Sequence, residues 1–75
     1  MEPYKNHSGN SKVQAYELEP EGITVQFSNG EVYAYSYSHT GKAHVENMKE
    51  LAQSGSGLGT YIDVVAKYGY ARQVR

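Results

Sequence analysis

Hydrophobic and polar residues alternate in the middle of the chain, as they do in strands that bury only one face. Ile23, Val25 and Phe27 are each separated by one polar residue, and this two-residue period predicts a strand. The dipeptide Asn29-Gly30 follows, which favours a tight type I′ turn because both residues tolerate a positive φ. The segment thus predicts a β-hairpin whose second strand runs from residue 31 to about residue 37.

A less regular alternation over residues 12–18 predicts an earlier strand, because a Glu-Pro-Glu-Gly turn follows it. The residues before it are mostly polar, so they bury too little apolar surface to offset the entropy of ordering. We therefore expect a flexible N-terminal tail over residues 1–11 and one folded domain over residues 12–75.

The second half of the chain has the three- and four-residue apolar spacing of helices. Thr40 is placed to cap a helix over residues 41–53. Its apolar positions form one stripe, which consists of Val45, Met48, Leu51 and Ala52. A Ser-Gly-Ser-Gly connector then leads to residues 58–67, where the spacing predicts a short second helix. Residues 68–72 form either a last strand or a loop, because Gly69 weakens both assignments.

These elements predict an α+β fold. Its sheet is a small three- to four-stranded antiparallel sheet, and it carries one amphipathic helix and a short second helix. The helices are expected to cover one sheet face, because the long helix has a single apolar stripe.

Eight tyrosines distinguish a composition that is 39% hydrophobic and contains no Trp. In the hairpin's second strand, Tyr33, Tyr35 and Tyr37 share one face, and the residues between them share the other. Either face can be the buried one. The tyrosines therefore either fill the core of a small domain or form an aromatic platform for a ligand.

Charge is uneven about a net value of −1. Residues 1–35 hold two lysines and five glutamates, whereas residues 36–75 hold five basic and three acidic side chains. An anionic partner is therefore expected at the C-terminal half. Aromatic rings beside basic groups are typical of single-stranded nucleic-acid sites, where bases stack and phosphates pair. The candidate nucleic-acid-binding residues are Tyr33, Tyr35, Tyr37, Lys67, Tyr68, Tyr70, Arg72 and Arg75.

Other chemistry has little support in the sequence. His39 and His44 are five residues apart, which is not the four-residue spacing of a helical metal pair, so no metal site is expected. Asp63 is expected to be solvated or paired with Lys67, one helical turn away. The glycine-rich residues 54–60 lack the Gly-Lys-Ser/Thr ending of a phosphate loop. We therefore expect neither enzymatic activity nor a cofactor.

The chain contains no cysteine, which excludes disulfides and thiolate metal sites. Its first residues lack the apolar run of a signal peptide. No stretch approaches the ~20 apolar residues that a membrane span needs. We therefore expect a cytoplasmic protein that does not bind a membrane.

Three segments together resemble one known family. They are residues 27–35 with the sequence FSNGEVYAY, the pair Gly57 and Tyr61, and the terminal run Tyr68-Gly69-Tyr70-Ala71-Arg72. They resemble the KTSC domain, a short module found at the C-terminus of some lysyl-tRNA synthetases and as a small free-standing bacterial or phage protein.

The central Tyr-x-Tyr of that family is matched by Tyr33 and Tyr35, and the resemblance covers about residues 13–72. The family often has a proline soon after this motif, where the present chain has Ser38-His39-Thr40, so the following connection is expected to differ. The resemblance implies a non-enzymatic module, and the synthetase context suggests RNA as its partner.

Two functions follow as hypotheses. The first is a small KTSC-like binding module for RNA or another nucleic acid. The alternative is a protein-protein interaction module, including a homodimer, in which the tyrosine row or an exposed strand edge contacts another protein. The near-neutral net charge favours the alternative, because nucleic-acid affinity comes mainly from Lys and Arg.

Overall fold

The sheet is the centre of the structure, a computed structural model that describes residues 1–7, 9, 11–67 and 69–75. Over these residues, five antiparallel strands lie in sequence order. They are β1 (Glu2–Pro3), β2 (Val13–Glu19), β3 (Gly22–Phe27), β4 (Val32–Ser36) and β5 (Arg72–Gln73). The predicted α+β class is confirmed, with one strand more than the three to four expected, because the N-terminal residues add the two-residue edge strand β1. The last strand that the sequence left open is formed as β5, by residues 72–73.

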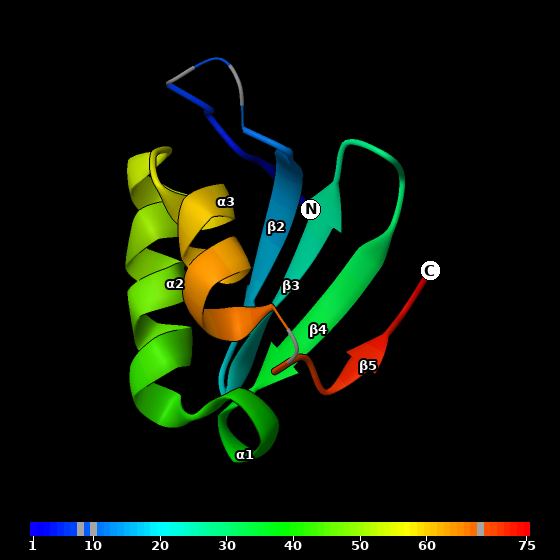
Figure 1. Ribbon diagram of the computed structural model, residues 1–75, viewed down its shortest axis with the longest axis vertical. Coiled ribbons are helices and arrows are strands. Elements are labelled where there is room, and N and C mark those ends of the chain that lie inside the picture. The colour runs from blue at the N-terminus through cyan, green and yellow to red at the C-terminus, as the bar shows by residue number, and fades with distance from the viewer. Residues whose placement is uncertain (8, 10, 68) are drawn as a thin grey trace.

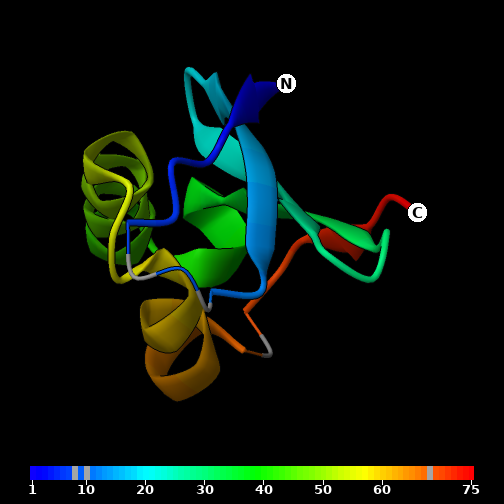
Figure 2. The ribbon, with the colours of Figure 1, turned by 90° about the horizontal axis from the view of Figure 1, so that it is seen from above.

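The helices lie between β4 and β5 in the chain. They are α1 (Tyr37–Thr40), α2 (Lys42–Ser54), α3 (Leu58–Tyr61) and the π-helical turn η1 (Ile62–Ala66), which continues α3. Figures 1 and 2 show α2, α3 and η1 on one side of the sheet. Within the described part of the chain, no helix is both long enough and apolar enough to cross a membrane.

Strand register decides which face of β4 packs under the helices. Tyr35 lies opposite Ile23 and Tyr33 lies opposite Val25, so the tyrosines share a face with the apolar residues of β3. Tyr35 is only 2% exposed and belongs to the core, while Tyr33 and Tyr37 are half-buried against it. Tyr33 and Tyr35 therefore lie on the sheet face that the helices cover. The strand ends at Ser36, one residue earlier than predicted, and Tyr37 is the first residue of α1. Val32, on the opposite face, is also buried but lies outside this core cluster.

The predicted β3–β4 hairpin is confirmed, but its predicted turn type is wrong. The N–H of Gly30 donates to the carbonyl of Phe27 (2.9 Å), and the N–H of Phe27 donates to the carbonyl of Glu31 (2.8 Å). Gly30 has a φ of 92°, whereas Asn29 does not have a positive φ. The loop is thus a type I turn followed by a left-handed glycine, the usual three-residue alternative to a type I′ turn.

The predicted long helix is confirmed as α2, which buries Val45, Met48 and Ala52. Its N-cap is Gly41, which makes no side-chain capping bond. The expected cap, Thr40, instead ends the extra turn α1, and its hydroxyl donates to the carbonyl of Gly69. Thr40 thereby attaches the C-terminal segment to the helical layer, so the expected capping role was wrong.

The second predicted helix is also present, as α3 and η1. Leu58, Ile62 and Ala66 are buried at four-residue spacing, which carries the stripe across both segments. Val64 and Val65 point to solvent. The apolar pattern therefore located the helix correctly but did not reveal that its second half is π-helical.

Residues 2–7 do not form part of the flexible tail expected over residues 1–11, of which residues 8 and 10 lie outside the described residues. β1 pairs with β2, and the Tyr4 ring is buried, with 6% of it exposed. Its hydroxyl oxygen accepts a hydrogen bond from the N–H of Leu58 (3.2 Å). The N–H of His7 donates to the carbonyl of Gly55 at the end of α2 (2.8 Å). One aromatic ring thus attaches a polar segment that composition alone would leave unfolded.

Replacing Tyr4 by Ala is expected to lower the free energy of unfolding by about 3 kcal/mol, because removing a buried aromatic ring leaves a cavity in the core. Urea denaturation measures this loss. Glu2→Ala, in the exposed strand β1, is the control and is expected to change stability by less than about 0.5 kcal/mol. An equally small effect of Tyr4→Ala would show that the segment is a flexible tail after all.

Candidate binding pocket

A pocket of about 360 Å³ lies between the β3–β4 hairpin and η1. Its aromatic and apolar lining consists of Phe27, Tyr33, Tyr35, Ile62 and Tyr70. Its charged lining consists of Lys12, Glu31, Asp63 and Lys67. The combination of an apolar wall with a few polar groups is typical of ligand sites, and the volume lies at the lower end of their usual range.

Two tyrosines form the accessible aromatic wall. The ring of Tyr33 lies edge-on to Phe27, with 5.7 Å between centroids, and only 4.7 Å from the tilted ring of Tyr70. Tyr70 is 37% exposed and Tyr33 is half-buried. Tyr35 also lines the pocket, but it is a core residue with almost no exposed surface. The two rings are inclined by 58°, so a flat ligand can lie parallel to only one of them, and Tyr70 is the more exposed.

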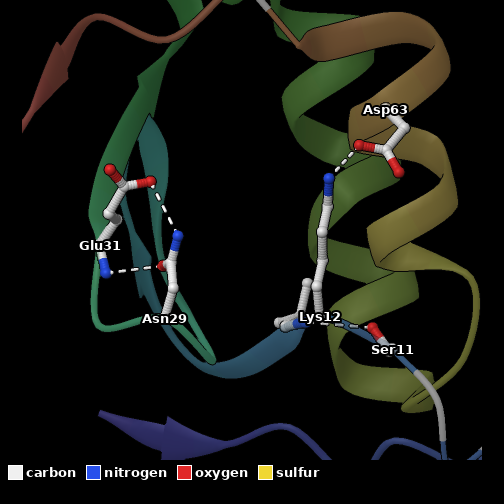
Figure 3. A network of polar contacts seen from close by, with 6 residues as sticks. Ser11, Lys12, Asn29, Glu31 and Asp63 are labelled. Atoms are coloured by element: carbon white, nitrogen blue, oxygen red, sulfur yellow. Dashed lines mark hydrogen bonds and ion pairs between the residues drawn. The ribbon is translucent and has the colours of Figure 1, made fainter.

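An ion pair at the pocket joins Lys12, the residue before β2, to η1. The Lys12 ammonium contacts the Asp63 carboxylate, and both side chains are about half exposed. The same ammonium lies 5.8 Å from the centroid of the Phe27 ring. Figure 3 shows this pair facing the Asn29 and Glu31 side chains of the hairpin. Asp63 therefore has a partner 51 residues away in the chain, which helical spacing could not predict.

The opposite side of the pocket is organised by Glu31. Its Oε1 accepts hydrogen bonds from the Tyr33 hydroxyl (3.2 Å) and from Nδ2 of Asn29 (3.1 Å). The Asn29 side-chain oxygen in turn accepts from the N–H of Glu31 (3.0 Å). Partial desolvation of Tyr33, followed by the nearby Glu31 charge, raises the pKa of the Tyr33 hydroxyl. This hydroxyl therefore stays protonated and donates to the carboxylate at neutral pH.

The structure brings four of the predicted site residues to this pocket: Tyr33, Tyr35, Lys67 and Tyr70. Arg72 and Arg75 are not among the described residues that line it. Arg72 lies opposite Ala34 in the sheet, and therefore on the face that Tyr33 does not share. The predicted residue Tyr68 lies outside the described residues.

Tyr37, also predicted for the site, is the first residue of α1 and contacts side chains of α2 instead of the pocket. Its hydroxyl donates to Glu46 (2.5 Å), and the ammonium groups of Lys42 and Lys49 lie 5.8 and 5.4 Å from its ring centroid. The hydrogen bond raises the pKa of Tyr37 and lowers that of Glu46. The three predicted tyrosines thus divide between the core (Tyr35), the pocket (Tyr33) and the helical surface (Tyr37), because β4 ends at Ser36 and Tyr37 begins α1.

Sequence reasoning missed Lys12, Phe27, Glu31 and Asp63 as pocket residues. Glu31 could have been predicted, because it lies two residues before Tyr33 and therefore on the same face of the predicted strand. Lys12 and Asp63 come together only through the fold.

His39 and His44 are both exposed. Nδ1 of His44 lies 2.8 Å from the Tyr61 hydroxyl, and Nδ1 of His39 lies 3.1 Å from the Ser36 hydroxyl. Among the residues described, no three side chains of the metal-ligating types gather into one group. Each histidine thus has a hydrogen-bonding neighbour of its own.

Comparison with known proteins matched this chain to no family model, no curated protein and no solved structure. The resemblance to the KTSC domain therefore rests on the sequence segments that carry it.

The buried hydroxyl of Tyr35 is expected to make the free energy of unfolding fall at alkaline pH. Burial raises the pKa of its hydroxyl from 10.0 to about 12. The folded protein therefore holds this proton more tightly than the unfolded chain, so the stabilisation is complete below pH 10 and is lost as the pH rises towards about 12. Urea denaturation over this interval should show a steeper decline for the wild type than for Tyr35→Phe, which has no proton to lose. Equal slopes would contradict the assignment.

Proposed function

We propose that this protein is a small non-enzymatic RNA-binding module whose pocket accepts one base of a single strand. The observation that carries the proposal is the pair Tyr33 and Tyr70, which lines a pocket that two lysines also line. Stacking on an aromatic side chain contributes about 1–3 kcal/mol per base. A second contact to phosphate is then sufficient to hold a single strand weakly.

Lys12 and Lys67 are the proposed phosphate contacts. The ion pair of Lys12 with Asp63 is about half exposed, and such pairs contribute only about 0–1 kcal/mol. A phosphate can therefore replace Asp63 as the partner of Lys12 at little cost. Arg72 is no longer proposed as a phosphate contact beside the stacked base, because strand register places Arg72 on the other face of the sheet.

Two sequence features support the same function. The KTSC resemblance includes the strand that carries Tyr33 and the terminal segment that carries Tyr70, and its synthetase context suggests RNA. The net charge of −1 predicts weak, salt-sensitive binding rather than a strong sequence-independent grip.

Protein interaction is the second candidate, and one observation favours it. β2 extends past the two-residue strand β1 by residues 17–19, and Leu18 there is 41% exposed. A strand from a second copy of the chain could extend the sheet along this edge. Sedimentation at two protein concentrations detects such a homodimer, whereas a monomer at both excludes it.

Tyr70→Ala is expected to weaken binding of a short single-stranded RNA about tenfold, because one stacking contact is lost. Fluorescence anisotropy at low and moderate salt measures the affinity. The control is Tyr37→Ala, a partly buried tyrosine that does not line the pocket. Thermal unfolding confirms that each variant is folded. If the two variants lose equal affinity, the stacking role of Tyr70 is wrong.

Asp63→Asn is expected to strengthen RNA binding about threefold at low salt, because Lys12 no longer has a carboxylate that competes with phosphate. The increase should shrink as salt is added. Glu50→Gln removes one negative charge from an exposed site on α2 outside the pocket lining. It controls for the change in net charge and should have a smaller effect. Weaker binding by Asp63→Asn than by Glu50→Gln contradicts the phosphate role of Lys12.

A further inference from the structure

The hairpin loop presents a carboxylate to the pocket in a fixed position. Glu31 is held by its backbone bond to the Asn29 side chain and by two hydrogen bonds to its Oε1, from Asn29 and Tyr33. Within the described part of the chain, no donor is hydrogen-bonded to the second carboxylate oxygen, Oε2. The pocket therefore offers an oriented hydrogen-bond acceptor beside the Tyr33 ring.

The other pocket carboxylate is placed differently. Asp63 is paired with Lys12 on the far side, as Figure 3 shows. A nucleotide whose phosphate contacts Lys12 would therefore direct its base towards the hairpin, where Glu31 lies.

The four RNA bases differ in what they can offer a carboxylate, which only accepts hydrogen bonds when ionised. The Watson–Crick edge of guanine carries two adjacent donors, the ring N–H and the exocyclic amino group. Adenine and cytosine each combine an amino group with a ring nitrogen that is an acceptor, and that acceptor would face the negative charge. Uracil has one N–H between two carbonyl oxygens. Guanine is thus the base whose edge best complements Glu31.

We infer that Glu31 makes the pocket selective for guanine in single-stranded RNA. The base stacks on Tyr70, the more exposed of the two inclined rings, and its donor edge bonds the second carboxylate oxygen of Glu31, Oε2. Asn29 is a positioning residue that fixes the carboxylate and does not touch the base. This inference rests on the proposed function, since it names the base that the proposed pocket accepts.

The test uses four short RNAs of equal length that differ only in one central base, G, A, C or U, within flanking uridines. The wild-type protein is expected to bind the guanine RNA about tenfold more tightly than the other three, since a hydrogen bond to a charged group has about this effect. Glu31→Gln should reduce the preference to about twofold or less, because the amide is a weaker acceptor and also adds a donor.

The matched control is Glu17→Gln. Glu17 is exposed and pairs with Thr24, which places it on the sheet face away from the pocket, so this variant should keep the full guanine preference. Equal affinity of the wild type for all four RNAs overturns guanine selectivity but leaves the proposed RNA-binding function intact. A preference that persists in Glu31→Gln overturns the role of Glu31. Failure to bind any of the four RNAs overturns both proposals.

Discussion

The structure depends on burying one face of the sheet under α2, α3 and η1 with few large apolar side chains. The chain has one Phe and no Trp, and a domain of this size can bury only roughly 60% of its unfolded surface. Tyrosines therefore supply much of the core volume, and Tyr4, Tyr16 and Tyr35 are all buried in it. Their hydroxyls need partners, and within the described residues no buried side-chain polar atom lacks one.

The same constraint accounts for the pocket. Tyrosines at the centre of the sheet are covered by helices. Tyr33 and Tyr70 instead line the pocket that lies between the hairpin and η1. An aromatic ring that is partly core and partly exposed is suited to both packing and stacking. The question whether the tyrosines fill the core or form a platform thus has a divided answer. Tyr35 is core, while Tyr33 has core contacts on one side and the pocket on the other.

Features that depend on neighbouring residues could be predicted from the sequence, whereas features that depend on contacts between distant residues could not. Strand alternation and helical spacing located β2, β3, β4, α2 and the second helix, because each pattern is repeated over adjacent residues. Three features depended on contacts between distant residues and were missed: the burial of Tyr4 against Leu58, the ion pair of Lys12 with Asp63, and the use of Thr40 to hold the C-terminal segment.

The turn type and the sheet face of Arg72 could not be predicted either, because both depend on how the strands pair. Asn29-Gly30 is compatible with two loop geometries, and the choice depends on the hydrogen-bond register of the flanking strands. The face of Arg72 depends on which residue of β4 it pairs with, and a two-residue strand has no periodicity from which to predict this. The candidate site was therefore predictable in its aromatic character but, apart from Lys67, not in its charged residues.

In the proposed function, the pocket between the β3–β4 hairpin and η1 binds a base of single-stranded RNA. The most direct test is a two-dimensional amide NMR titration of the whole chain with a mixed pool of short single-stranded RNAs, at low and moderate salt. Binding in the pocket should shift the amide signals of Lys12, of residues 27–33 and 62–67, and of Tyr70, and these shifts should diminish as salt is added. A spectrum that does not change, or shifts confined to residues 17–19 at the β2 edge, would contradict it.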